Sequence, residues 1–175
     1  MDDIQNSRGA GGARGGGAAG AAQLRELFVF RAGARRFAVF REEVEGVAEG
    51  LRPAPLPFAP PAVVGVVALR GRVRTALDPL RLFAAPAGAA NETPPAPARP
   101  PRLFVALAGD QQLALACDSA EESFTISTDE LRPDPDAEAP ARGLVAHDAS
   151  EVTLLDPARL FDAAMRGRDR RRRRT

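Results

Sequence analysis

The sequence predicts a mostly β fold with short helices, built from two similar small subdomains. The first observation is an internal repeat: residues 65–83 return without a gap as residues 143–161, and both copies end on Leu-Asp-Pro-X-Arg-Leu-Phe. The second is an echo upstream of each copy, Leu-Phe-Val at residues 27–29 and again at residues 103–105. The two repeats have nearly equal spacing, so each half is a unit larger than a helix pair or a propeller blade. The repeated segments are short apolar runs separated by turn residues, which favours strands.

The composition is that of a globular chain, and it excludes several kinds of site and segment. A length of 175 residues with 45% hydrophobic content is enough for one domain or a tight pair of subdomains. All 24 basic residues are arginine and the chain has no Trp, Tyr or Lys, a bias to which we give no functional weight. The single cysteine, Cys117, excludes an internal disulfide framework and a Cys-rich zinc site. No apolar run is long enough to span a bilayer, and the N-terminal pattern is not that of a secreted protein. We expect a cytoplasmic protein without stable membrane insertion.

Three stretches fall outside the predicted subdomains. Residues 1–24 are rich in Gly and Ala, bury too little apolar surface to fold, and are expected to form a disordered tail. Their glycines follow no strand and open no helix, which argues against a phosphate-binding loop. Residues 84–101 are Pro-rich and typical of a polyproline-like connector. Subdomain 1 then covers residues 25–83, subdomain 2 residues 102–164, and an Arg-rich tail residues 165–175.

The first subdomain opens with a predicted hairpin. Residues 27–31 and 36–40 are short runs rich in Phe and Val around a Gly-containing turn. The second half repeats this pattern with Gly109-Asp110 in the turn. Residues 41–48 allow a brief helix or an irregular crossing, and the pattern does not choose between them.

A second hairpin and a short helix follow. Residues 63–69 are continuously apolar with an internal glycine, as expected of a strand buried on both faces or bent at a barrel corner. Arg70-Gly71-Arg72 is expected to turn the chain into a strand over residues 73–77. In both halves Leu-Asp-Pro supplies an aspartate that can cap a helix and a proline at its first turn. This predicts helices over residues 79–83 and 157–164.

The sequence offers no credible set of catalytic groups. Its one histidine, His147, lies in a predicted loop, and Cys117 lies in the apolar run 113–117, where a free thiol behaves as a small buried hydrophobe. Asp148 and Glu151 beside one histidine do not have a recognisable metal-ligand spacing. We therefore expect no catalytic site, no cofactor and no metal, and a function carried by surfaces.

Residues 59–71, Ala-Pro-Pro-Ala-Val-Val-Gly-Val-Val-Ala-Leu-Arg-Gly, followed by Asp78, resemble the signature of the chemotaxis coupling proteins of the CheW type. The opening hairpin, residues 37–65 and residues 118–135 can be laid along the same pattern without gaps, and the resemblance covers about residues 25–164. It implies two five-stranded SH3-like β-barrels around a shared core. It also implies a non-catalytic adaptor with two partners, the cytoplasmic tip of a chemoreceptor and the regulatory domain of a CheA-type histidine kinase. The alternative is a diverged scaffold that keeps the barrels and serves another partner outside chemotaxis.

The same resemblance implies where a receptor would bind. The positions that this family uses in or around its receptor-facing groove are Val44, Val47, Val64, Leu69 and Arg70. Arg70 is the residue on which we expect binding to depend most. It also allows a structural role, bracing the turn before the glycine that follows it.

The sequence departs from the family pattern at three positions. Gly46 stands where the pattern has a glutamate, Ala68 where it has an asparagine, and Thr75 where it has a proline. Arg70 has therefore lost an expected acidic neighbour. Glu45 lies next to the lost position but is expected to project in a different direction.

The C-terminal end is strongly basic. Residues 166–174 carry seven arginines and one aspartate. Such a tail can be a solvated end, or it can bind an acidic protein, nucleic acid or an anionic membrane. No aromatic residues are interleaved with the arginines for base stacking, so nucleic acid is not the expected partner.

Overall fold

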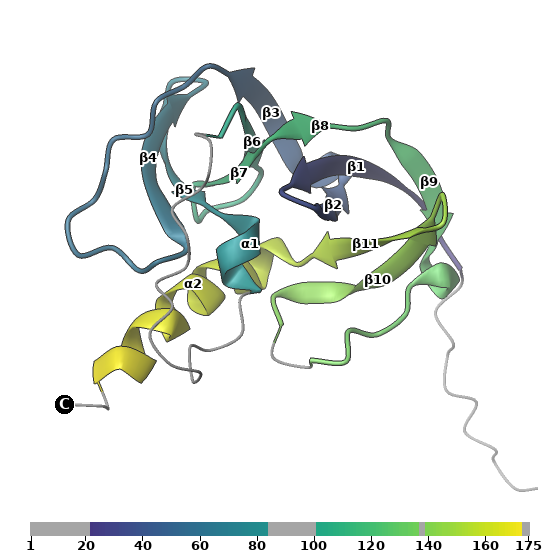
Figure 1. Ribbon diagram of the computed structural model, residues 1–175. Helices are drawn as coiled ribbons and strands as arrows, with labels where there is room; N and C mark the ends of the chain where they lie inside the picture. The colour runs from purple at the N-terminus through teal and green to yellow at the C-terminus, as the bar shows by residue number, and fades with distance from the viewer. Residues whose placement is uncertain (1–21, 84–100, 137–138, 173–175) are drawn as a thin grey trace, which may run out of the picture.

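A computed structural model describes residues 22–83, 101–136 and 139–172 of the chain (Figure 1). The strands are β1 (Leu24–Ala32), β2 (Arg35–Phe40), β3 (Val44–Glu49), β4 (Val63–Leu69), β5 (Arg72–Leu77), β6 (Leu103–Leu107), β7 (Leu113–Cys117), β8 (Ser119–Ala120), β9 (Phe124–Ser127), β10 (Ala141–His147) and β11 (Ser150–Leu155). The helical elements are the 3-10 turns η1 (Arg41–Glu43) and η2 (Thr128–Glu130) and the α-helices α1 (Pro79–Leu82) and α2 (Pro157–Arg172).

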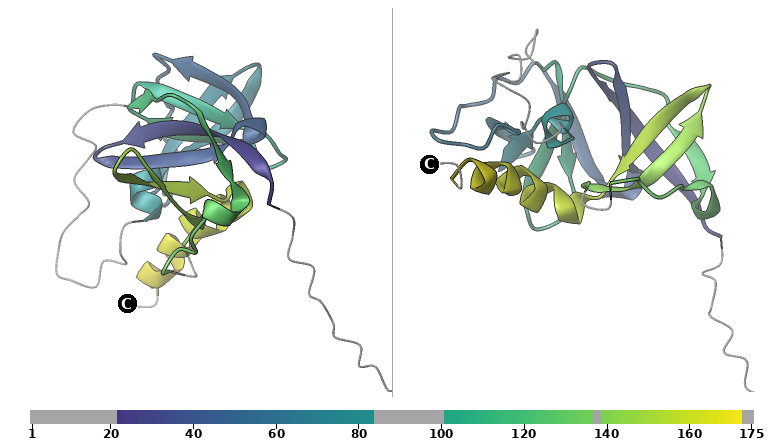
Figure 2. Two further views of the ribbon diagram at one scale, coloured as in Figure 1. Left: turned by 90° about the vertical axis from the view of Figure 1, so that its right-hand side faces the viewer. Right: turned by 60° about the horizontal axis from the view of Figure 1, so that its bottom comes forward.

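The strands form two sheets. Sheet A has the order β10-β11-β2-β1-β8, with β9 also paired to β1, and sheet B has the order β3-β6-β7-β5-β4. Most neighbours are antiparallel, whereas β2–β11 and β5–β7 are parallel. The sheets stand side by side, and α2 begins near the end of β11 and extends below sheet B, away from sheet A (Figure 2). This arrangement confirms the predicted fold class, a mostly β protein of two similar sheets, with one strand more than expected in sheet A.

Neither sheet comes from one half of the chain. The hairpin β1–β2 of the first half lies in sheet A beside β11, and the hairpin β6–β7 of the second half lies in sheet B between β3 and β5. Each half therefore places its opening hairpin in the sheet that the other half completes. The sheets thus do not follow the predicted subdomain boundaries at residues 25–83 and 102–164. The repeat is real in sequence, but each folded unit needs strands from both copies.

Three hydrophobic clusters hold this arrangement together: one inside sheet A, one inside sheet B, and one shared between the sheets and α2. On β1, Val29 belongs to the cluster inside sheet A, and the next residue, Phe30, belongs to the shared cluster. On β6, Phe104 lies inside sheet B and Val105 again enters the shared cluster. Both faces of these strands are buried, which explains why their sequences are continuously apolar and do not alternate.

The repeat is clearest where a loop crosses the strand that follows it. A β-carbon on Gly65 of β4 would overlap the carbonyl of Ala54 in the preceding loop. The backbone of Ala54 is hydrogen-bonded to Val66, the residue after this glycine. Gly143 of β10 stands in the same relation to the carbonyl of Arg132. Each glycine also follows a β-bulge in its strand. Glycine is therefore required at both positions because another backbone approaches closely.

Both repeated aspartates cap helices as predicted. The Asp78 carboxylate accepts a hydrogen bond from the Leu80 amide at 2.9 Å, at the start of α1. The Asp156 carboxylate accepts one from the Ala158 amide at 3.3 Å, at the start of α2. Both helices begin with the proline that follows the aspartate, where the missing N–H leaves no hydrogen bond unmade.

The structure differs from the predictions in several elements. Residues 41–48, predicted as a helix or an irregular crossing, form the 3-10 turn η1 and then the strand β3. The acidic run here has low β propensity, so β3 forms because of its pairing with β6 and not because of its own sequence. Helix α2 continues to Arg172, into the predicted Arg-rich tail, and Leu24 of the predicted N-terminal tail opens β1. Residues 1–21, 84–100 and 173–175, which hold the rest of the predicted tails and connector, lie outside the described residues.

Candidate partner-binding surface

The five predicted contact residues lie on β3, β4 and the turn after β4. These are the two edge strands of sheet B; Leu69 and Val64 pack in the cluster inside the sheet, and Val44 packs on the shared cluster. Val47 is 40% exposed and Arg70 is exposed, whereas Val44 and Val64 are partly buried against the hydrophobic clusters. Leu69 is only 3% exposed, so it belongs to the interior of sheet B. The structure thus places Val44, Val47 and Arg70 where the start of β3 meets the end of β4, with Leu69 inside and Val64 near the other end of β4, and Val47 and Arg70 are the exposed members.

Arg70 occupies a strained position in the turn that joins β4 to β5. Leu69 pairs with Arg72, so Arg70 and Gly71 are the two central residues of the hairpin turn. Their φ angles are 52° and 73°, the pattern of a type I′ turn. Glycine, asparagine and aspartate suit such positions, whereas a long side chain is disfavoured there by about 1 kcal/mol.

The side chain of Arg70 lies across Gly46 of β3. A β-carbon at residue 46 would overlap Nε of Arg70, and Cδ and Cζ lie almost as close. The contact brings the end of β4 against the start of β3, so the two edges of sheet B meet here. Among the described residues, the Arg70 guanidinium makes no hydrogen bond and no ion pair.

The neighbouring carboxylate, Glu45, is held by a different arginine. Arg74 of β5 has no exposed surface; its Nη2 donates to Glu45 at 2.5 Å and its Nη1 donates to the carbonyl of Leu107 at 2.8 Å. The hydrogen bond from Arg74 lowers the pKa of the Glu45 carboxyl, and the charges of Arg74, Arg72 and Arg70 lower it further, against desolvation. Glu45 is therefore paired with Arg74 and forms no ion pair with Arg70 among the described residues.

The other two positions that depart from the family pattern lie on the outer face of β4 and β5. Ala68 is exposed and pairs with Val73, which is itself 66% exposed. Thr75 is partly buried and pairs with Val66. This face is apolar and borders the turn that carries Arg70.

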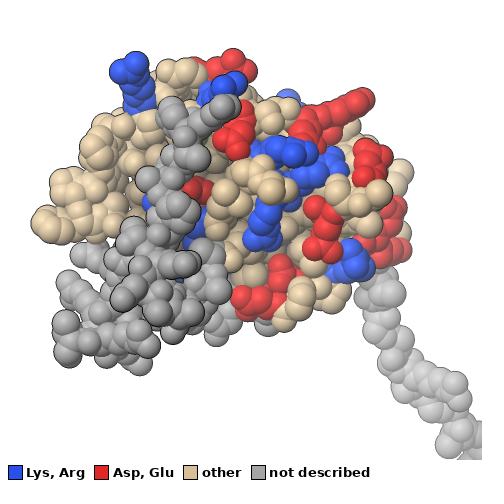
Figure 3. All heavy atoms as spheres, viewed as in Figure 1, with Lys and Arg blue, Asp and Glu red and all other residues tan. Residues whose placement is uncertain are grey.

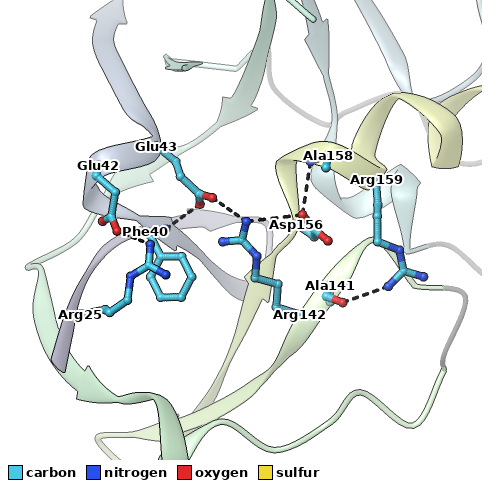
Figure 4. Close-up of polar contacts among 9 residues, drawn as sticks. All are labelled: Arg25, Phe40, Glu42, Glu43, Ala141, Arg142, Asp156, Ala158 and Arg159. Carbon is cyan, nitrogen blue, oxygen red and sulfur yellow. Dashed lines mark hydrogen bonds and ion pairs between the residues drawn. The ribbon is translucent and has the colours of Figure 1, made fainter. Parts of the chain in front are cut away.

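A second set of contacts fixes the start of β3 (Figure 4). Arg142, the bulge residue of β10, donates to Glu43 of η1 at 2.6 Å and lies 3.5 Å from the Asp156 carboxylate. Glu43 also accepts a hydrogen bond from the Phe40 amide at 3.1 Å. The Arg25 guanidinium carbon lies over the Phe40 ring, 3.5 Å from the ring centroid. Arg25 also forms an ion pair with Glu42. Sheet A and the cap of α2 thereby position the turn from which β3 begins.

The loop between β3 and β4 presents an apolar surface that the sequence reasoning missed. Phe58 is 91% exposed with a positive φ of 59°, and Leu56 beside it is 42% exposed. The loop leaves β3 at Glu49 and enters β4 at Val63, so it lies at the opposite end of β4 from Arg70. In Figure 3 the edge of the molecule occupied by β4 and this loop carries mostly uncharged side chains. The sequence did contain a signal for this exposed ring: Phe58 lies among prolines 55, 57 and 60. A proline-rich loop has few ways to bury an aromatic ring, so the ring is expected at the surface.

Cys117 and His147, the two residues considered for catalysis, are both engaged in packing. Cys117 of β7 is buried, and burial raises the pKa of its thiol to about 12, with a smaller contribution from Asp118. His147, expected in a loop, is the last residue of β10, and its ring stacks on Phe124 with centroids 3.6 Å apart. Within the described residues, no group of three or more His, Cys, Asp or Glu side chains is placed to hold a metal ion. In the same part of the chain, no helix is both long and apolar enough to cross a membrane.

Comparisons with known proteins agree with this architecture. The family described as CheW-like domain matches residues 26–165. A protein named chemotaxis protein CheW, from Rhizobium meliloti (strain 1021), is 30% identical over 148 residues, which cover 81% of this chain and 90% of that protein. The scaffolding protein TtCheW from Thermoanaerobacter tengcongensis has a similar fold, with a TM-score of 0.64 at 17% identity, over 80% of this chain and 94% of that one.

Proposed function

The chain belongs to the CheW-like domain family, and we propose that it is a non-catalytic adaptor that couples a chemoreceptor to a CheA-type histidine kinase. The observation that carries the proposal is the extent of the similarity to the chemotaxis protein of Rhizobium meliloti, which runs through strands of both sheets. An adaptor of this kind acts by bringing two partners together, so its function depends on two separate surfaces.

We assign the receptor-facing surface to the edge of sheet B formed by β3 and the end of β4. Val47 and Arg70 are its exposed members. Val44 and Leu69 support it from beneath, because they pack in the hydrophobic clusters, and Val64 packs in the same cluster as Leu69 nearer the start of β4. A small apolar contact beside a charged side chain is the usual composition of a specific, reversible interface.

We assign the kinase-facing surface to the loop between β3 and β4. Barrels of this type associate with similar barrels through apolar contacts ringed by polar ones, and Phe58 with Leu56 is an exposed apolar pair on a loop. Its position at the far end of β4 from Arg70 leaves room for both partners at once. The regulatory domain of the kinase is the partner that we propose here.

The coupling role is tested by reconstitution. Kinase autophosphorylation is measured with a receptor cytoplasmic fragment from the same cell and increasing amounts of this chain. We expect the rate to change and to reach a plateau with adaptor concentration, as stoichiometric binding requires. The substitution Phe58→Ser is expected to weaken kinase binding and leave receptor binding intact, and Arg70→Ala to do the opposite, with neither changing the melting curve. If no histidine kinase of the native cell binds at micromolar concentration, the coupling role is wrong and the chain is a diverged scaffold for another partner.

A further inference from the structure

Arg70 combines three properties that rarely occur together at one residue. It lies in a left-handed turn position that disfavours a long side chain. Its guanidinium is exposed and held against the backbone of Gly46. Among the described residues it has neither a hydrogen bond nor an ion pair. Strained positions persist where the side chain has a role that the fold itself does not supply.

The electrostatic surroundings favour an acidic partner for this arginine. Arg70, Arg72 and Arg74 all act on one carboxylate, that of Glu45. Glu45 already accepts a hydrogen bond from Arg74 at 2.5 Å. Glu45 is therefore already engaged by the buried Arg74, and the exposed arginines at the turn between β4 and β5 are Arg70 and Arg72.

We infer that the segment of the receptor that docks on this edge supplies an aspartate or glutamate carboxylate to Arg70. The inference rests on the proposed receptor-binding role of β3 and β4. The planar guanidinium can receive a carboxylate through two parallel hydrogen bonds, which fixes orientation as well as charge. Val47, 40% exposed on the neighbouring strand, gives the same partner an aliphatic contact.

Gly46 leaves the place directly beneath the Arg70 guanidinium without a carboxylate of the same chain. With no side chain at residue 46, the Arg70 guanidinium lies against bare backbone, and no described residue accepts a hydrogen bond from it. An acidic side chain at residue 46 would lie directly beneath Arg70 and would satisfy it internally. The adaptor is therefore matched to receptors that carry an acidic residue in the docking segment.

Binding of the full chain to a receptor cytoplasmic fragment from the same cell, measured by calorimetry at low and moderate salt, tests the inference. Arg70→Asn is the first variant, because asparagine suits the left-handed position. We expect it to melt at or above the wild-type temperature, to bind the receptor about tenfold more weakly, and to lose salt dependence. The matched control is Asp148→Asn, the equivalent turn position of the second half, with a φ of 49°. It should leave receptor binding unchanged.

A second pair of variants separates charge from shape. Gly46→Glu introduces a competing carboxylate and should weaken binding about tenfold. Gly46→Ala displaces the arginine side chain without adding an acid and should change binding by less than about threefold. In the receptor fragment, each acidic tip residue is then neutralised in turn. One of these neutralised receptor residues should weaken binding to the wild-type chain but have no further effect on binding to the Arg70→Asn variant.

The experiment separates failure of the proposed receptor binding from failure of the proposed pairing of Arg70 with a receptor carboxylate. If the wild-type chain does not bind the receptor fragment, the proposed receptor-binding function fails and this inference fails with it. If the wild type binds but Arg70→Asn binds equally well, or Gly46→Ala and Gly46→Glu have the same effect, or no acidic receptor residue couples to Arg70, the inference alone is overturned.

Discussion

Arg74, with no exposed surface, ties Glu45 of β3 to the carbonyl of Leu107 of β6, and so joins three strands of sheet B through one side chain. Its Nε has no hydrogen-bond partner among the described residues. A buried arginine with two of its donor groups engaged is costly to keep, yet removing it leaves its partners unsatisfied. The pair therefore fixes where β3 lies more than it adds to stability.

Arg74→Met is expected to lower the free energy of unfolding by about 3 kcal/mol, because the carbonyl of Leu107 and the Glu45 carboxylate lose their donor. Urea denaturation followed by circular dichroism measures the change. Arg72→Met, at an exposed position two residues earlier, is the matched control and should change stability by less than about 0.5 kcal/mol. Equal effects of the two substitutions would contradict the role given to Arg74.

Stability should depend on acid pH through Glu45. Its folded pKa is lowered by the hydrogen bond from Arg74, so at acid pH the Glu45 carboxyl is protonated less in the folded state than in the unfolded state. The contribution is therefore fully present above the pKa of the unfolded carboxyl and is lost as pH falls through the lower folded pKa. The difference in stability between wild type and Glu45→Gln, measured by urea titration from neutral pH to about pH 3, should shrink as the pH falls. A difference that is constant over this range would refute the assignment.

The crossing of β10 by the segment at Arg132 should tolerate only glycine. Gly143→Ala places a β-carbon against the Arg132 carbonyl, which accepts the Leu144 amide hydrogen bond at 2.7 Å. Because backbone and not a flexible side chain must move, we expect a loss of about 2–4 kcal/mol. Gly50→Ala is the control: its φ is 68° but its β-carbon would meet open space, and about 1–2 kcal/mol is expected. Thermal melts of both variants compare them directly.

Elements that are determined by their own local sequence could be predicted. The predicted strand 63–69 has the bounds of β4, and the caps at Asp78 and Asp156 follow from Leu-Asp-Pro alone. Strand β3 was missed because its acidic sequence shows no β pattern, and only pairing with β6 makes it a strand. The exchange of hairpins was missed for the same reason, since a repeat shows which segments are alike and not which of them pair.

The candidate surface stays a prediction from the family resemblance, and the structure adds how its residues are placed. The family resemblance placed Val47 and Arg70 on one surface, and the loss of an acidic neighbour for Arg70 followed from Gly46. The interior place of Leu69 was less apparent, although its alternation with exposed Ala68 is a signal of a strand with one inner face. The role of Arg74 was missed because an arginine is seldom buried, and its inward position follows only from the register of β5 with β4 and β7.

Cys117 should be unreactive in the native protein. Burial raises the pKa of its thiol to about 12, so the nucleophilic thiolate is scarce at neutral pH. Labelling with an aromatic disulfide reagent at about pH 8 is expected to proceed only as fast as the protein opens, and to become rapid in denaturant. Rapid stoichiometric labelling of the folded protein would show that the thiol is accessible and would reopen a chemical role for it.

Neither half of the chain should fold alone. Sheet A takes β1 and β2 from the first half and the rest from the second, and sheet B takes β6 and β7 from the second half. Residues 25–85 and 102–165 expressed separately would each expose the faces that the missing strands cover, and each is near the lower size limit for an independent core. We expect each fragment to lack a cooperative thermal transition, and an equimolar mixture to recover one, because the exchanged hairpins can pair between two chains. A cooperative melt of either fragment by itself would mean that the sheets can be completed without exchange, and the interdependence of the halves would have to be abandoned.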